Sequence, residues 1–157
     1  MRSSIDVHNH LLDDDVVHEL SQLPGPLRDL STAPAVLGLP PLAVGRPTLL
    51  ADEQGAVVVL APADAEVDTA SVAELLGRLD LDPVPPDRAP GLTGYLLAFV
   101  PPVALECPSV LVVDEGVASQ DVVYAAAGEP GVILKVRAAD LIKATSAVVA
   151  SITRQAN

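Results

Sequence analysis

The chain has almost no aromatic side chains and a single cysteine. Aromatic residues make up only 2% of its 157 positions, which leaves few rings on which unpaired nucleic-acid bases stack. Cys107 stands alone and cannot form an internal disulfide, so we expect the reducing environment of the cytoplasm. Residues 1–6 also lack the apolar run of a signal peptide.

Basic residues and long apolar runs are scarce as well. Nine lysines and arginines stand against 21 acidic residues, which gives a formal net charge of −12. This charge opposes non-specific binding to nucleic acid or to an anionic membrane. The longest apolar stretch, 96–105, contains Pro101 and Pro102 and is far shorter than the ~18 residues that cross a bilayer. We therefore expect no membrane partner.

Three short apolar runs rich in β-branched residues lie in the second half of the chain, at 110–113, 122–126 and 132–136. Turn residues separate them at 114–116 and 128–131. Periodicity alone permits strands or buried helix, but runs this short between glycines favour strands. We predict three consecutive strands that form one unit, around which the rest of the chain packs.

The remainder of the chain predicts short helices and one hairpin. Cap residues, apolar spacing and glycine stops indicate helices, at 4–13, 31–38, 68–77 and 138–145. The hairpin joins 48–51 to 56–60. An edge strand is expected at 16–20, residues 147–152 fit helix or strand, and prolines argue against a central strand within 94–105. With 50% hydrophobic residues, we expect one domain spanning 1–157.

The order of several phrases resembles the YbaK / prolyl-tRNA synthetase-associated domain family. In chain order these phrases lie at 31–38, 47–50, 60–64, 93–95, 112–115, 128–131 and 139–141. The resemblance covers about residues 10–153. It implies an α/β (α+β) fold with a mixed, barrel-like sheet flanked by short helices.

The resemblance also implies trans-editing, in which an amino acid wrongly esterified to a tRNA is hydrolysed without a metal or another cofactor. The implied partners are mischarged tRNA, bound weakly because of the −12 charge, and an aminoacyl-tRNA synthetase. The positions implied to bind substrate are Thr48, Pro102, Asp114, Gly128 and Gly131. From the residues alone, Asp114 either holds a water or caps the following turn. The two glycines either present N–H groups to an anion or make a tight turn.

This chain departs from the family pattern at its polar positions. The family carries a lysine directly before its threonine, where Pro47 stands here; Arg46 is the one nearby candidate for the lysine's contact with an anion. Apolar residues also replace two family glycines, a serine and an acid, at Ala98, Ala104, Ala126 and Ile133 respectively. These replacements predict a weakened deacylase with Arg46 as its catalytic cation. The alternative is a non-catalytic binding module of the same fold, for a partner protein or a small apolar ligand.

The N-terminal segment resembles a second, unrelated pattern. Asp6, His8 and His10 match the first metal-binding strand of amidohydrolases, where two histidines on one strand face share a metal. That family needs a larger barrel and further histidines, and only His18 remains in this chain. We therefore interpret these residues as exposed polar residues and predict no metal.

Overall fold

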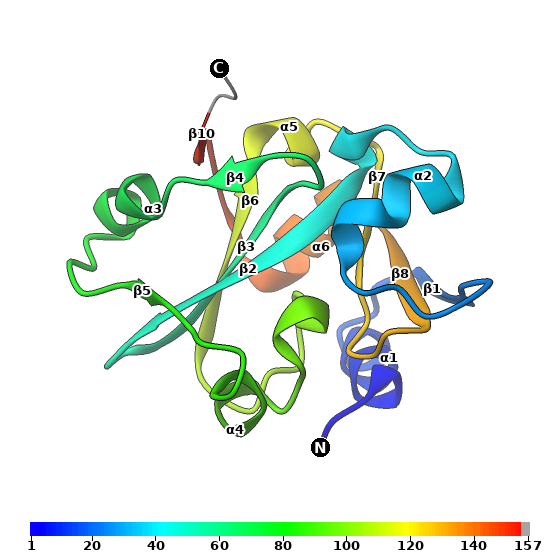
Figure 1. Cartoon of the computed structure of the whole chain (residues 1–157), viewed down its shortest axis with the longest axis horizontal. Coiled ribbons are helices and arrows are strands. Elements are labelled where there is room, and N and C mark those ends of the chain that lie inside the picture. The colour runs from blue at the N-terminus through cyan, green and yellow to red at the C-terminus, as the bar shows by residue number, and fades with distance from the viewer. Residues whose placement is uncertain (155–157) are drawn as a thin grey trace.

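The computed structural model describes residues 1–154 as a mixed sheet with helices on both faces (Figure 1). The main sheet has the strand order β1-β8-β7-β2-β3-β6-β9, and β5 pairs with β2. Its strands are β1 His18–Gln22, β2 Val44–Asp52, β3 Gly55–Pro62, β5 Asp82–Pro83, β6 Ser109–Asp114, β7 Val122–Ala126, β8 Val132–Arg137 and β9 Val148–Ala150. A separate pair consists of β4 Glu66–Val67 and β10 Thr153–Arg154. The predicted mixed α/β class is confirmed.

Short helices connect these strands, mostly where cap chemistry indicates them. The α-helices are α1 Ser4–Asp13, α2 Ala33–Leu37, α3 Thr69–Leu76, α4 Ala89–Thr93, α5 Glu115–Ala118 and α6 Ala138–Thr145. The 3-10 helices are η1 Leu30–Thr32, η2 Pro41–Ala43 and η3 Leu97–Phe99. Left-handed glycines end α2 and α3, at Gly38 and Gly77. Within residues 1–154, none of the helices combines the length and the apolar character needed to cross a membrane.

The hairpin of β2 and β3, and not the predicted three-strand unit, forms the middle of the sheet. All three predicted strands exist, and β7 pairs with β8. However, β6 pairs in parallel with β3, so that β3 and β2 separate β6 from β7. The prediction of one contiguous unit is therefore wrong. The physical reason is that the chain passes through α5 from one side of the hairpin to the other, so that, of the three predicted strands, only β7 and β8 are neighbours in the sheet.

The two faces of the sheet bury different cores. One face carries the largest core, to which α1, α4, α5 and α6 contribute Val7, Leu11, Ala89, Val117 and Leu141. The opposite face carries two smaller cores: η1, α2 and η3 cover one, and α3 covers the other. Figure 1 shows β2 and β3 crossing the molecule, with α3 at the left of the view and α2 at the right; both helices cover the face with the smaller cores. Alternation along β2 follows this division, since Leu49 faces the large core and Val44 and Leu50 face the small ones.

A split between β2 and β7 positions the loop that follows α4. The two strands pair only at Val44 with Tyr124 and at Gly45 with Ala125. Beyond that point η3 lies against them, and Phe99 accepts a 3.1 Å hydrogen bond from the backbone N–H of Gly128, just past β7. Phe99 packs into the core under α2, whereas Val100 packs into the large core. The loop therefore passes between the two faces of the sheet at this split.

Candidate functional site

Arg46 lies on the face of β2 that carries Val44 and Thr48, beside the core under α2. Its guanidinium donates a 3.4 Å hydrogen bond from Nη1 to the carbonyl oxygen of Ala63. Hydrogen bonds from Ser31 lower the pKa of the nearby Asp29, and the charge of the Arg46 guanidinium lowers it a little further. Arg46 thus places a half-buried positive charge at the rim of this core.

Three of the four positions where the family pattern expects polar or glycine residues lie in the core next to Arg46, whereas Ala104 lies in the large core on the other face. Ala126 pairs across the sheet with Ile133, and both lie in the core under α2, against which Ala98 packs. Because Gly45 pairs with Ala125, Arg46 and Ala126 are the next residues along two neighbouring strands. We call Ala98, Phe99, Ala126 and Ile133 the apolar site cluster. It is nearly closed to solvent, since Phe99 is 5% exposed, Ala126 1% and Ile133 3%.

Of the other predicted site residues, Thr48 and Gly128 lie near the split between β2 and β7. Thr48 is half-buried and stands two residues beyond Arg46 on the same face of β2. Gly128 has φ +91°, and a Cβ atom there would lie 2.8 Å from Cε1 of Tyr95. Both its backbone conformation and its space therefore require glycine. Its N–H is bound to Phe99, which favours the turn explanation for this residue over an anion site.

The other three predicted site residues lie on different elements: Pro102 in the loop before β6, Asp114 at the end of β6, and Gly131 in the turn before β8, which also contains Gly128. Pro102 lines a cavity of about 380 Å³ with residues of α1 and α6, which cover the face opposite to Arg46. Asp114 caps α5 and accepts backbone hydrogen bonds from Gly116 at 2.9 Å and Ile152 at 3.4 Å. Gly131 lies in the turn before β8, where its carbonyl oxygen accepts a hydrogen bond from the N–H of Leu23. Because both carboxylate oxygens of Asp114 accept backbone hydrogen bonds, the capping explanation of this residue is favoured over a water site.

Comparison with known proteins identifies the family to which this arrangement belongs. The model of the aminoacyl-tRNA editing domain matches residues 25–144, which is more than half of the chain. The chain belongs to this family. The resemblance noted from the sequence is thereby confirmed. A search of curated proteins finds no match.

Solved structures support the same fold for this editing domain. The hypothetical protein APE2540 has a TM-score of 0.86 and 29% identity, with 95% of this chain and 99% of that chain covered. A protein described as a candidate trans-editing enzyme for prolyl-tRNA synthetase has a TM-score of 0.85 and 23% identity, with 99% of each chain covered. A scaffold protein used for epitope grafting by design has a TM-score of 0.86 and 24% identity, again with 99% of each chain covered.

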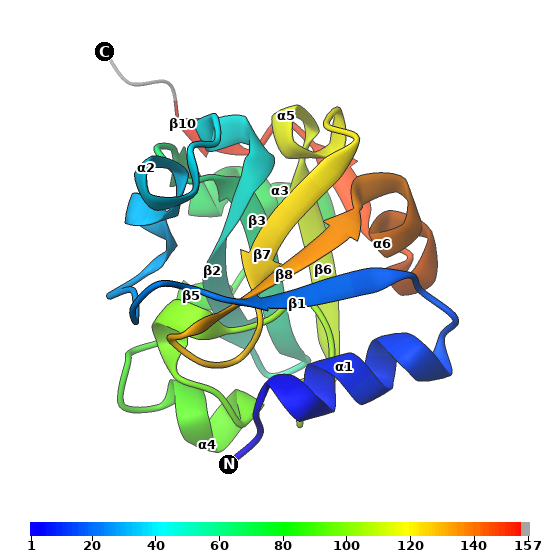
Figure 2. The same cartoon turned by 90° about the vertical axis from the view of Figure 1, so that its right-hand side faces the viewer.

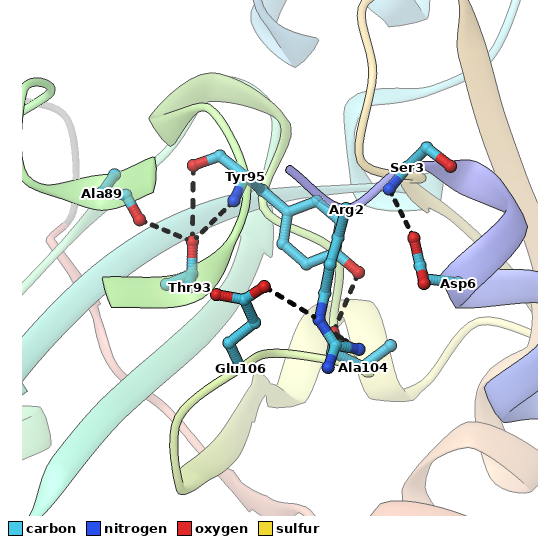
Figure 3. Close-up of polar contacts among 8 residues, drawn as sticks. All are labelled: Arg2, Ser3, Asp6, Ala89, Thr93, Tyr95, Ala104 and Glu106. Atoms are coloured by element: carbon cyan, nitrogen blue, oxygen red, sulfur yellow. Dashed lines mark hydrogen bonds and ion pairs between the residues drawn. The ribbon is translucent and has the colours of Figure 1, made fainter. Parts of the chain in front are cut away.

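A second set of contacts in this editing domain holds the loop between α4 and β6, and nothing in the sequence predicts it (Figure 3). The hydroxyl of Tyr95 donates a 2.9 Å hydrogen bond to the carbonyl oxygen of Ala104, and Nη1 of Arg2 donates to the same oxygen at 3.2 Å. Nε of Arg2 also lies 3.5 Å from a carboxylate oxygen of Glu106. Burial, reinforced by the negative charge of Asp6, raises the pKa of Tyr95 to about 12. The phenol is therefore a hydrogen-bond donor at neutral pH.

The amidohydrolase-like histidines of the editing domain do not form the strand that their pattern suggests. His8 and His10 lie on α1 and not on a strand. Two residues apart on a helix, they point to opposite sides and cannot share a metal ion. In the part of the chain that the structure describes, no three His, Cys, Asp or Glu side chains are grouped so as to hold one.

Proposed function

We propose that this editing domain is an aminoacyl-tRNA deacylase that acts slowly on mischarged tRNA. In the proposed reaction, water adds to the ester carbonyl, and the bond between that carbon and the ribose oxygen breaks. The products are the free amino acid and a tRNA with its terminal hydroxyl restored. The observation that supports this proposal is a cation, Arg46, beside Ala126 and Ile133, the positions of the family's serine and acid, within an editing-domain fold.

Arg46 would stabilise negative charge on the substrate, and Thr48 would contact the substrate beside it. A guanidinium in a partly water-excluded place stabilises an oxyanion or a phosphate. Ala126 and Ile133 cannot accept or donate a side-chain proton, and Asp29 is bound to Ser31. The tRNA's own hydroxyl and a held water must then carry the proton transfers. This division of roles predicts slow turnover.

The closed apolar site cluster favours a second candidate, a binding module without turnover. Three residues of the cluster are almost completely buried in one core, namely Phe99, Ala126 and Ile133. An aminoacyl side chain enters only if Phe99 moves. In this second proposal the surface beside Arg46 binds a partner, such as an aminoacyl-tRNA synthetase or a small apolar ligand, and no ester is cleaved.

Single-turnover deacylation of a panel of mischarged tRNAs distinguishes the two proposals. For a slow deacylase, the wild type hydrolyses at least one of these esters faster than buffer alone. Arg46→Ala then lowers that rate by about 10²-fold, the usual effect of losing one oxyanion donor. Arg88→Ala, at the start of α4, is the matched control and keeps the rate. If no charged tRNA is hydrolysed faster than in buffer, the enzyme proposal fails and the binding module remains.

Restoring the family's polar groups gives an independent test. Ala126→Ser combined with Ile133→Asp places a hydroxyl and a carboxylate on adjacent strands beside Arg46. If the chain is a weakened deacylase, the double variant turns over faster than the wild type, provided that circular dichroism shows it is folded. A folded double variant with no gain on any substrate would contradict the assignment of these two positions to the reaction.

A further inference from the structure

The only aromatic ring pair found among the described residues joins two histidines from different elements. Nδ1 of His8, on α1, lies 2.8 Å from Nε2 of His18, at the start of β1. Their ring centroids are 4.9 Å apart and the rings are inclined at 61°. Figure 2 shows α1 lying alongside β1 at the edge of the sheet. The partner of His8 is thus His18, and not His10, which the sequence pattern places next to it.

A backbone carbonyl fixes the orientation of His18. Nδ1 of His18 lies 2.8 Å from the carbonyl oxygen of Val16, which can only accept a hydrogen bond. Neutral His18 therefore carries its proton on Nδ1 and directs the lone pair of Nε2 toward His8. Metal-binding histidines in proteins are commonly oriented in this way, by a hydrogen bond from the second ring nitrogen to a carboxylate, a backbone carbonyl or water. His8 is exposed, so its own proton can move through solvent from Nδ1 to Nε2.

We propose that His8 and His18 form a two-histidine surface site for Ni²⁺ or Cu²⁺. With metal–nitrogen bonds of about 2.0 Å, two nitrogens in cis positions of a tetragonal ion are about 2.8–2.9 Å apart. Tetrahedral Zn²⁺ with similar bonds needs about 3.3 Å. The 2.8 Å separation is that of the hydrogen bond between the two rings in the free chain, and it shows that the two nitrogens come close enough to bind one ion. We choose Ni²⁺ and Cu²⁺ because imidazole suits both ions and both accept two nitrogens in cis positions. Binding breaks the hydrogen bond between the rings, leaves the proton of His8 on Nε2 and turns both lone pairs toward the ion.

Water fills the remaining coordination positions, because His8 is exposed and His18 half-buried. The formal net charge of −12 also raises the concentration of cations around the chain. Since the two ligands come from α1 and β1, a bound ion joins the N-terminal helix to the edge strand. Binding therefore stabilises the folded chain by a free energy that grows with the logarithm of the free ion concentration once this exceeds the dissociation constant.

Calorimetric titration of the full chain with Ni²⁺ at pH 7.5 tests the site. We expect one ion per chain, and His8→Ala or His18→Ala should weaken binding by at least about tenfold. His10→Ala is the matched control, because it removes an exposed histidine from the same helix and should leave binding unchanged. Absence of stoichiometric binding, or an equal loss in all three variants, would overturn the proposal.

Two further measurements keep the test independent of folding defects. Ni²⁺ should raise the melting temperature of the wild type and of His10→Ala, but not that of a folded His18→Gln variant. With Cu²⁺, electron paramagnetic resonance should show two coupled nitrogens in the wild type and one in His8→Gln. Two nitrogens remaining in both glutamine variants would place the ion elsewhere and refute the assignment.

Discussion

The loop between α4 and β6 contains two alanines where the family pattern expects glycine, and these two alanines differ in backbone conformation and in packing. Ala98 lies in η3, a helical segment, and packs against the other residues of the apolar site cluster. Ala104 has the left-handed φ of +67°, which a non-glycine residue rarely adopts. At Ala98 the methyl group is part of the packing. At Ala104 the chain keeps a glycine-like backbone although it has a side chain.

Different forces hold the two places. Around Ala98 the side-chain contacts are apolar, and the backbone of Phe99 donates a hydrogen bond to Leu96 and accepts one from Gly128. Around Ala104 the carbonyl oxygen accepts from both Tyr95 and Arg2. Two donors on one oxygen offset a strain of roughly 1 kcal/mol in the left-handed region. Hydrogen bonds therefore hold the backbone of Ala104 in a left-handed conformation, whereas apolar packing holds the loop at Ala98.

The largest expected loss of stability comes from disrupting the apolar packing around Ala98. Phe99→Ala removes a nearly buried ring and should lower the free energy of unfolding by about 3–5 kcal/mol. Urea denaturation measures the loss. Leu97→Ala, in the same 3-10 helix but only half-buried, is the control and should lose clearly less. Equal losses would mean that Phe99 does not hold the cluster together.

Removing one of the two hydrogen bonds to the carbonyl oxygen of Ala104 should lower the stability by a smaller amount. Tyr95→Phe keeps the buried ring and removes the hydroxyl bond to Ala104, whose oxygen still accepts from Arg2. We expect a loss of about 1–2 kcal/mol in unfolding free energy, measured in urea. Tyr124→Phe is the control, since Tyr124 is the other tyrosine and is half-buried; it should change stability by less than about 0.5 kcal/mol.

The same hydroxyl gives the stability a dependence on alkaline pH. Folding raises the pKa of Tyr95 from 10.0 to about 12, so between these values the folded state holds a proton that the unfolded state has released. The contribution of this group is fully present below pH 10 and declines as the pH rises toward 12. Tyr95→Phe should show a flatter decline above pH 10 than the wild type in chemical denaturation. Parallel curves for the two proteins would rule out this linkage.

Local signals predicted the short elements of this fold well. Cap residues and glycine stops predicted α2 and α3, and the polar turn at 52–55 predicted the hairpin of β2 and β3. These signals lie within a few residues of the structure that they determine. The pairing of β3 with β6 joins segments some 50 residues apart, such as Val57 and Val110. No local pattern specifies that partner, so the strand order could not be predicted.

The candidate site could be predicted only residue by residue. The sequence pattern singled out Arg46, Ala126 and Ile133, but their proximity follows from the registers of β2, β7 and β8. Phe99 was missed because an aromatic residue in an apolar run signals only burial. Arg2 was missed because its contact with Ala104 spans 102 positions of the chain. The position of Pro102 on the other face likewise depends on the loop passing between the two faces.

A pair of glycine substitutions tests the comparison most sharply, with the smallest expected effects. Ala104→Gly relieves the left-handed strain and should raise the free energy of unfolding by up to about 1 kcal/mol, because glycine adopts this φ without a Cβ penalty. Ala98→Gly loses a packed methyl group and loosens a helical segment, so it should lower that free energy by about 1 kcal/mol. Both variants can be measured in the same urea titration. If the two changes in unfolding free energy have opposite signs, different forces hold the loop at Ala98 and at Ala104. A loss of stability in both variants would mean that the backbone of Ala104, held by Tyr95 and Arg2, has no strain for glycine to relieve.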